Sequence, residues 1–175
     1  MRRWINAAAV GVLLMGSVAT AVPTGAVPIG AALRDVKLDG LNGPSHRLAE
    51  FRGKPLIVNL WASWCGPCRA ETASLERLAW HDEAQYFRII GISTDDIRQE
   101  AQGWLAQSNA TISHFLDHDT VLETMLGADH IPLTVLVDAQ GRVIERVYGA
   151  QTWDDTAHLA RIRRAFHLTG SVKPP

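Results

Sequence analysis

Cys65 and Cys68 are the only cysteines in the 175-residue sequence, and they stand three residues apart. An apolar run at 55–62 precedes them, and residues 67–80 carry helical spacing. Residues i and i+3 of a helix lie about 5–6 Å apart, within the Cα separation of about 4.4–6.8 Å that a disulfide tolerates. The ring that such a disulfide closes is too small to stabilise the fold much through loop entropy. The spacing therefore favours a reversible, redox-active disulfide.

The position of Cys65 at the expected start of this helix favours its thiolate form. The first turn of a helix has unpaired backbone N–H groups and a partial positive charge. Pro67 fits inside that turn, where its missing N–H costs little. The thiolate is the species that attacks a disulfide. We therefore interpret Cys65 as the nucleophile and Cys68 as the resolving thiol that releases a mixed disulfide.

Two other uses of the cysteine pair are less favoured. One is a purely structural disulfide, which the short ring disfavours. The other is half of a zinc site, which needs four correctly spaced ligands. The nearest further candidates, His114 and His118, fall in an expected strand and turn, not on one helical face. The sequence also has no flavin or nicotinamide motif, so we expect neither a metal nor a cofactor.

Glu71 is the other side chain for which we expect a chemical role. It follows Cys68 by three residues, and Leu75 and Leu78 continue the same helical stripe. The leucines mark this stripe as the buried one, and charged residues seldom lie there without a partner or a task. Two interpretations stay open. Either Glu71 reaches solvent at the edge of the stripe and complements the helix start, or burial raises its pKa so that it can hold or pass a proton.

Apolar patterns predict the elements that position these side chains. The runs at 55–62 and 86–93 are typical of strands buried on both faces, and residues 133–149 predict a hairpin. The other expected segments are strands at 33–40 and 112–116, helices at 96–107, 120–128 and 153–168, and a loop at 46–54. The turn Asp39-Gly40 should close the first strand. This order predicts an α/β fold with a central mixed β-sheet flanked by helices.

The N-terminal residues differ in composition from the rest. Two arginines precede an uncharged, mostly apolar stretch at 7–22, and residues 19–21 are small, at the spacing that a signal peptidase reads. We predict that residues 1–26 are a secretory signal peptide or an uncleaved membrane anchor plus spacer, and that 30–170 form one domain. A cytoplasmic helix is the third alternative. The first two imply export, to a place where disulfides can persist.

Composition limits the classes of function. Hydrophobic residues make up 47% of the chain and charged residues 20%, as in a packed soluble core. The net charge of -1 gives no strong attraction to nucleic acid or to an anionic membrane surface. We therefore expect no nucleic-acid partner.

Several segments together resemble a known family. They are WASWCGPCRAE at 61–71 with the FRGKPLIVNL that precedes it, HIPLTVLVDAQGRV at 130–143 and YGAQTWDD at 148–155. From about Ala31 to Leu168 the chain resembles the thioredoxin fold, and more narrowly its exported TlpA/ResA-like thiol–disulfide oxidoreductases. The resemblance implies a thioredoxin-like three-layer fold with an N-terminal extension, in a periplasmic or otherwise extracytoplasmic protein.

The resemblance also implies partners and a direction of reaction. The substrates would be thiols and disulfides of other proteins, and a membrane thiol carrier would donate the electrons. The direction would be reductive, toward cytochrome c maturation or copper-site assembly. Two alternatives remain open: a peroxiredoxin-like peroxidase, which shares the fold, and a non-catalytic chaperone that holds a soft metal through both thiolates.

Further site residues are carried over from the family. Pro132 would face the disulfide with a cis bond before it, exposing the backbone of Ile131 to a partner's cysteine segment. Trp64 would cover the disulfide, and Gly66 and Pro67 would complete its surroundings. Glu71 matches a glutamate that the family carries on this helix.

Two departures from related proteins are visible. Asn59 stands where cytoplasmic thioredoxins usually carry an aspartate, so the proton relay of those proteins is missing there. Ala73 stands where the exported relatives usually carry a proline, which predicts a straighter helix.

Overall fold

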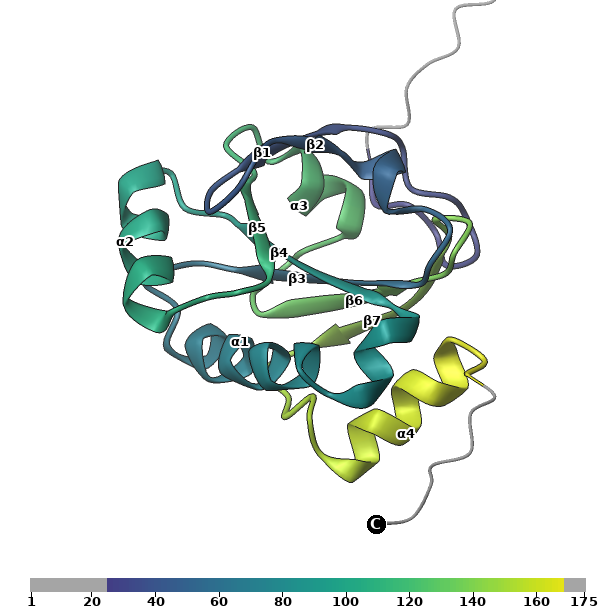
Figure 1. Cartoon of the computed structure of the whole chain (residues 1–175). Helices are drawn as coiled ribbons and strands as arrows, with labels where there is room; N and C mark the ends of the chain where they lie inside the picture. The colour runs from purple at the N-terminus through teal and green to yellow at the C-terminus, as the bar shows by residue number, and fades with distance from the viewer. Residues whose placement is uncertain (1–24, 169–175) are drawn as a thin grey trace, which may run out of the picture.

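The computed structural model describes residues 25–168, which form one seven-stranded sheet with helices packed on both faces (Figure 1). The strands are β1 (Lys37–Gly40), β2 (His46–Arg47), β3 (Leu56–Trp61), β4 (Arg88–Ser93), β5 (Ser113–Leu116), β6 (Leu133–Val137) and β7 (Val143–Tyr148). The α-helices are α1 (Gly66–Ala79), α2 (Arg98–Ser108), α3 (Val121–Leu126) and α4 (Thr156–Ala165). Two 3-10 helices are η1 (Leu48–Phe51) and η2 (Asp82–Tyr86).

The sheet is mixed, as the order of elements predicted. Its strand order is β2-β1-β5-β4-β3-β6-β7. Strands β3, β4 and β5 run parallel, and β6 pairs with β3 in the antiparallel direction. Every residue of the central strand β3 is buried, which agrees with a sequence that is apolar except at Asn59.

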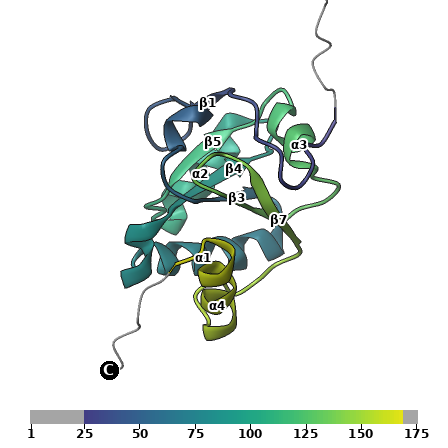
Figure 2. The same ribbon diagram turned by 90° about the vertical axis from the view of Figure 1, so that its right-hand side faces the viewer.

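Alternate residues of β3 face the two halves of the core. Val58 and Leu60 pack with Met125 and Leu126 of α3 on one face. Ile57 packs on the other face with residues of α1 and α4. The two views agree with this division, since α1 and α4 lie together on the face opposite α3 (Figures 1 and 2). Side chains of a strand alternate between its faces, so a single strand supports both layers.

The expected loop at 46–54 was wrong. It contains β2 and η1, because Glu50 accepts a hydrogen bond from the backbone N–H of Arg47 and caps the short helix. The first strand is also shorter than expected. It begins at Lys37, because Asp35 accepts hydrogen bonds from Arg47 and from the N–H of Ala49. Gly40 belongs to β1, so the predicted Asp39-Gly40 turn was wrong too.

The predicted signal peptide or anchor falls mainly outside the described residues, as do the last residues of the predicted domain, 169–170. Within 25–168, no helix is long and apolar enough to cross a membrane. The described chain joins the fold almost at once, because Val27 packs in the core and its N–H donates to the carbonyl of Met125.

Gly91, in the centre of β4, gives a testable prediction about packing. A Cβ added there would lie 2.1 Å from Nδ1 of His114 and 2.9 Å from Nε1 of Trp61, and both rings are buried. Overpacking of this kind costs about 1–3 kcal/mol or more. We expect Gly91→Ala to lower the free energy of unfolding by that amount in urea denaturation.

Gly103→Ala is the matched control, because Gly103 lies in α2 and a Cβ there meets nothing within 4 Å. It should raise the free energy of unfolding by about 0.5–1 kcal/mol, the usual gain of alanine over glycine in a helix. Equal midpoints for the two variants would contradict the packing described at Gly91.

Candidate active site

The candidate site lies at the edge of the sheet where the parallel strands end. Strand β3 ends at Trp61 and β4 at Ser93, while β6 runs the other way and begins at Leu133. The loops that follow β3 and β4 and the loop that precedes β6 therefore meet at one edge. These loops carry Cys65 and the Ile131-Pro132 bond, so the topology brings the two predicted parts of the site together.

The two cysteines form a disulfide at the start of α1. Their Cα atoms are 5.3 Å apart, so the separation inferred from their spacing is confirmed. Cys65 is the N-cap of the helix, and its Sγ accepts a hydrogen bond of 3.2 Å from the backbone N–H of Cys68. Both side chains are buried, Cys65 with 6% and Cys68 with 1% of its surface exposed. A thiolate on Cys65 would keep this hydrogen bond and face the positive end of the helix.

Exposed residues surround the buried disulfide. Trp64 is 68% exposed, and Gly66 and Pro67 in the first turn of α1 are also exposed. The buried tryptophan of the motif is Trp61, which packs in the same apolar cluster as both cysteines. The surface next to Cys65 is thus an open one that another protein can approach.

The Ile131-Pro132 peptide bond is cis, as the resemblance implied. Pro132 is buried, and Ile131 is half-buried against the apolar cluster that holds both cysteines. The loop before β6 therefore lies beside the disulfide. His130, two residues before Pro132, is exposed and stacks on Tyr148.

Glu71 is completely buried, so the interpretation that it reaches solvent was wrong. Its Oε1 accepts hydrogen bonds from Nε1 of Trp153 at 2.8 Å and from Thr134 and the N–H of Gln151 at 3.3 Å. Its Oε2 accepts one from Nδ2 of Asn59 at 2.8 Å. Burial raises the pKa of the Glu71 carboxyl, against the opposing effect of these hydrogen bonds.

The partners of Glu71 were not predicted from the sequence. Asn59 and Thr134 are paired across β3 and β6, and Asn59 donates to Thr134 at 3.0 Å as well as to Glu71. The sequence did carry a signal for them, because Asn59 and Thr134 are polar residues inside otherwise apolar strands. Trp153 packs in the same apolar cluster as residues of the last helix, and its indole N–H donates to Glu71.

The two histidines considered for a zinc site lie in different surroundings. His114 is buried in β5, whereas His118 is exposed beyond the end of that strand. Across the described range 25–168, no group of three or more histidine, cysteine or acidic residues is arranged to hold a metal ion.

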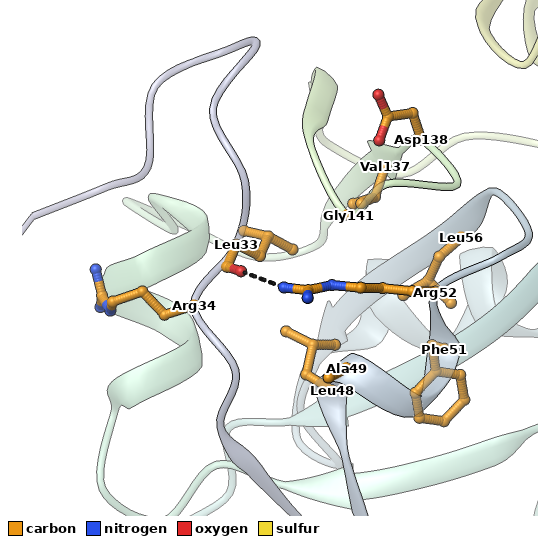
Figure 3. A pocket seen from close by; sticks show the side chains of 10 residues that line it. All are labelled: Leu33, Arg34, Leu48, Ala49, Phe51, Arg52, Leu56, Val137, Asp138 and Gly141. Carbon is orange, nitrogen blue, oxygen red and sulfur yellow. Dashed lines mark hydrogen bonds between the residues drawn. The ribbon is translucent and has the colours of Figure 1, made fainter.

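A small cavity lies at the end of the sheet opposite the disulfide. Figure 3 shows the side chains that line it. It is found where Leu56 begins β3 and Val137 ends β6, and the Arg52 side chain crosses it to reach the carbonyl of Leu33 at 3.5 Å. Its volume of about 10 Å³ holds no more than one water molecule. This cavity is therefore too small to hold a substrate, and neither cysteine lines it.

Comparison with known proteins gives consistent similarities. The profile of the Redoxin family matches residues 28–162. The thiol-disulfide oxidoreductase ResA of Geobacillus thermodenitrificans is 27% identical over 139 residues, which cover 79% of this chain and 80% of that protein. The thiol:disulfide interchange protein DsbE of Escherichia coli K12 is 32% identical over 134 residues, which cover 73% of this chain and 70% of that protein.

Solved structures agree with these similarities. A Chlorobium tepidum protein assigned as a thiol:disulfide interchange protein DsbE matches with a TM-score of 0.73 and 25% identity, over 80% of this chain and 99% of that one. The thioredoxin domain of a Bacteroides vulgatus thiol-disulfide oxidoreductase matches with a TM-score of 0.65 and 24% identity, over 77% and 99%. The expected thioredoxin-like fold is confirmed.

Proposed function

The chain belongs to the Redoxin family, and from this premise we propose that it is an exported thiol–disulfide oxidoreductase that reduces disulfides in other proteins. It is similar to ResA and DsbE over most of its length and carries the CxxC pair. The observation that carries the proposal is the placement of the Cys65–Cys68 disulfide at a helix start, beside an exposed surface and one turn from a buried carboxyl.

The proposed reaction starts from the dithiol form. The Cys65 thiolate attacks one sulfur of the partner's disulfide, that bond breaks, and the other partner sulfur leaves as a thiolate that takes up a proton. Cys68, having given up its proton, then attacks Sγ of Cys65. The bond between Cys65 and the partner breaks, and the second partner sulfur leaves as a thiolate that takes up a proton. The partner leaves with two thiols and two more electrons, and the protein ends in the disulfide form described above.

The start of α1 supports the first step. The N–H of Cys68 already donates to Sγ of Cys65 at 3.2 Å in the oxidised protein. A sulfur with negative charge accepts this hydrogen bond more strongly than a neutral one. The same helix end therefore stabilises the thiolate of Cys65 that makes the first attack.

Glu71 is suited to the second step. Cys68 is buried, so its proton needs an acceptor that is close to hand within the protein. Glu71 lies one turn further along the same helix, and its raised pKa makes it a better proton acceptor than an ordinary carboxylate. We assign it as the base for Cys68. Asn59 takes no proton itself, and instead holds Glu71 in place by its hydrogen bond.

Partner binding is assigned to the exposed residues near the disulfide. The backbone of Ile131, set by the cis bond to Pro132, would pair in strand fashion with the partner's cysteine segment. Trp64, Gly66 and Pro67 would border this contact. A membrane thiol carrier would return the electrons, and the partners would belong to cytochrome c maturation or copper-site assembly.

The reduction potential of the Cys65–Cys68 couple tests the proposed direction. Dithiol proteins of this kind span roughly -270 to -120 mV, from reductants to oxidants. We expect a value near the reducing end, together with reduction of a disulfide in a model protein substrate. A value near the oxidising end would reverse the proposed direction, and consumption of peroxide without a thiol substrate would favour a peroxidase.

The N-terminus tests the proposed export. N-terminal sequencing of the protein from its host should find a chain that begins near Val22 in an extracytoplasmic fraction. An intact Met1 in a membrane fraction would indicate an anchor, and an intact Met1 in the cytosol would refute export.

A further inference from the structure

Asp95, on the loop after β4, is a buried carboxylate that the reaction above does not use. Only 1% of its surface is exposed. Its oxygens accept hydrogen bonds from the N–H of Ser63 at 3.0 and 3.1 Å and from the Ser63 hydroxyl at 2.6 Å. The Ser93 hydroxyl donates a fourth, at 2.7 Å. Burying a carboxylate is costly, and here the cost is offset by donors from the loop that leads to Cys65.

Ser63 is held from a second side by the helix that carries the cysteines. Arg69, in the first turns of α1, donates to the carbonyl of Ser63 from Nε at 2.9 Å and from Nη2 at 2.5 Å. The N–H, the hydroxyl and the carbonyl of Ser63 are therefore all bound. Ser63 and Cys65 are two residues apart, so their Cα atoms lie within about 7.6 Å of each other. Contacts that fix Ser63 therefore also restrict the position of Cys65.

The charge of Asp95 has an effect that its hydrogen bonds alone would not have. A negative charge close to Cys65 opposes the formation of a thiolate there, because like charges repel more strongly in a buried setting than in water. Other charged side chains lie at the same edge of the sheet, and they include Arg69 and Glu71 on α1, Asp96 beside Asp95, and Asp129 and His130 before Pro132. Of these, Arg69 shares its partner, Ser63, with Asp95.

We propose that Asp95 is a positioning residue that, together with Arg69, clamps Ser63 to fix Cys65 at the start of α1, and whose charge biases the cysteine pair toward the disulfide. This inference rests on the proposed exchange chemistry and deepens it. Strongly oxidising cysteine pairs are those whose reduced form is stabilised. Conversely, a dithiol whose thiolate is less stabilised gives up its electrons more readily. Asp95 would thus make the reduced protein a better reductant.

The Asp95→Asn variant of the full chain tests the charge. Asparagine keeps the shape of the side chain, and a serine hydroxyl can accept a hydrogen bond as well as donate one. At a pH where Cys65 is ionised in both proteins, we expect the equilibrium of the Cys65–Cys68 couple with glutathione to shift about tenfold toward the dithiol, the effect of lowering the pKa of Cys65 by one unit. Asp96→Asn is the matched control, because it removes the same charge from the neighbouring exposed residue and should shift the equilibrium less than about twofold.

The Ser63→Ala variant tests the clamp without touching the charge, and it serves if Asp95→Asn does not fold. It removes the 2.6 Å hydrogen bond to Asp95. We expect faster hydrogen exchange at the amides of residues 63–65, with the exchange in β3 unchanged. Unchanged exchange at 63–65 would overturn the clamp, and equal glutathione equilibria for Asp95→Asn and Asp96→Asn would overturn the role of the charge. Because glutathione is a small thiol, these outcomes are separate from a failure to reduce protein disulfides.

Discussion

Cys65→Ser should leave no thiol–disulfide exchange above background, whereas Cys68→Ser should accumulate mixed disulfides with protein partners. A serine hydroxyl at position 65 is not ionised at neutral pH and cannot attack a disulfide, even with the N–H of Cys68 directed at it. With serine at position 68, the first attack still occurs, but no second thiol resolves the product. Each variant lacks one sulfur of the unmodified protein, and the two should give opposite results.

The measurement is non-reducing electrophoresis of each reduced variant after incubation with a protein disulfide substrate. The Cys68→Ser lane should contain a partner-linked band that disappears on reduction, and the Cys65→Ser lane should not. If only the Cys65→Ser variant formed the partner-linked band, Cys68 would be the nucleophile and Cys65 the resolving thiol. The burial of Cys68, 1% exposed against 6% for Cys65, supports the assignment, because the attacking thiol has to reach a partner and the resolving thiol does not.

The fold was predictable where local pattern and tertiary environment agree. The apolar run at 55–62 became the buried strand β3, and the helical spacing after it became α1. Prediction failed for β2, which is two residues long, and for η1, which depends on Glu50 and Asp35 accepting hydrogen bonds from nearby backbone. Such short elements bury too little surface to leave a periodic pattern in the sequence.

The two cysteines of the site could be predicted from the sequence, but most of the residues that hydrogen-bond around them could not. Two cysteines at this spacing before a helix predict a redox-active disulfide, whereas the stripe of α1 left open whether Glu71 is buried or reaches solvent. The donors to Glu71 could not be predicted, because Trp153 lies 82 residues away in the chain and Thr134 lies 63. The clamp on Ser63 was likewise invisible, since an aspartate after a strand is common in loops and only the fold brings Asp95 beneath Ser63.

Glu71→Gln should slow the resolving step by on the order of 10²-fold, the usual contribution of a well-placed general base. Glutamine keeps the length of the side chain but cannot take a proton from Cys68. Attack by Cys65 should be little affected, so the mixed disulfide should persist longer than in the unmodified protein. Rapid-quench measurement of its decay between pH 5 and 9 tests this, and a decay rate and pH profile equal to those of the unmodified protein would remove the proton-transfer role.

A separate measurement establishes that the Glu71 carboxyl itself has the raised pKa. Its folded pKa lies above the ordinary value of 4.5, so between these two values the folded protein binds more protons than the unfolded one. The stability that Glu71 contributes is therefore complete below pH 4.5 and is lost as the pH rises through the folded pKa. In urea denaturation of the oxidised proteins, the free energy of unfolding of the unmodified protein minus that of Glu71→Gln should fall over this window.

Glu76→Gln is the matched control on the same helix, and it should give the opposite slope. Burial alone would raise the pKa of Glu76, but the nearby His114 ring, 3.7 Å away, and the hydrogen bonds from Thr111 and Ile112 outweigh it and lower the pKa to about 2. The corresponding stability difference should therefore grow as the pH rises from about 2 to 4.5, and stay level above that. If Glu71→Gln and Glu76→Gln gave the same slope, Glu71 would be an ordinary ionised carboxylate. The hydrogen bonds from Trp153 and Asn59 would then serve only to hold its charge inside the fold.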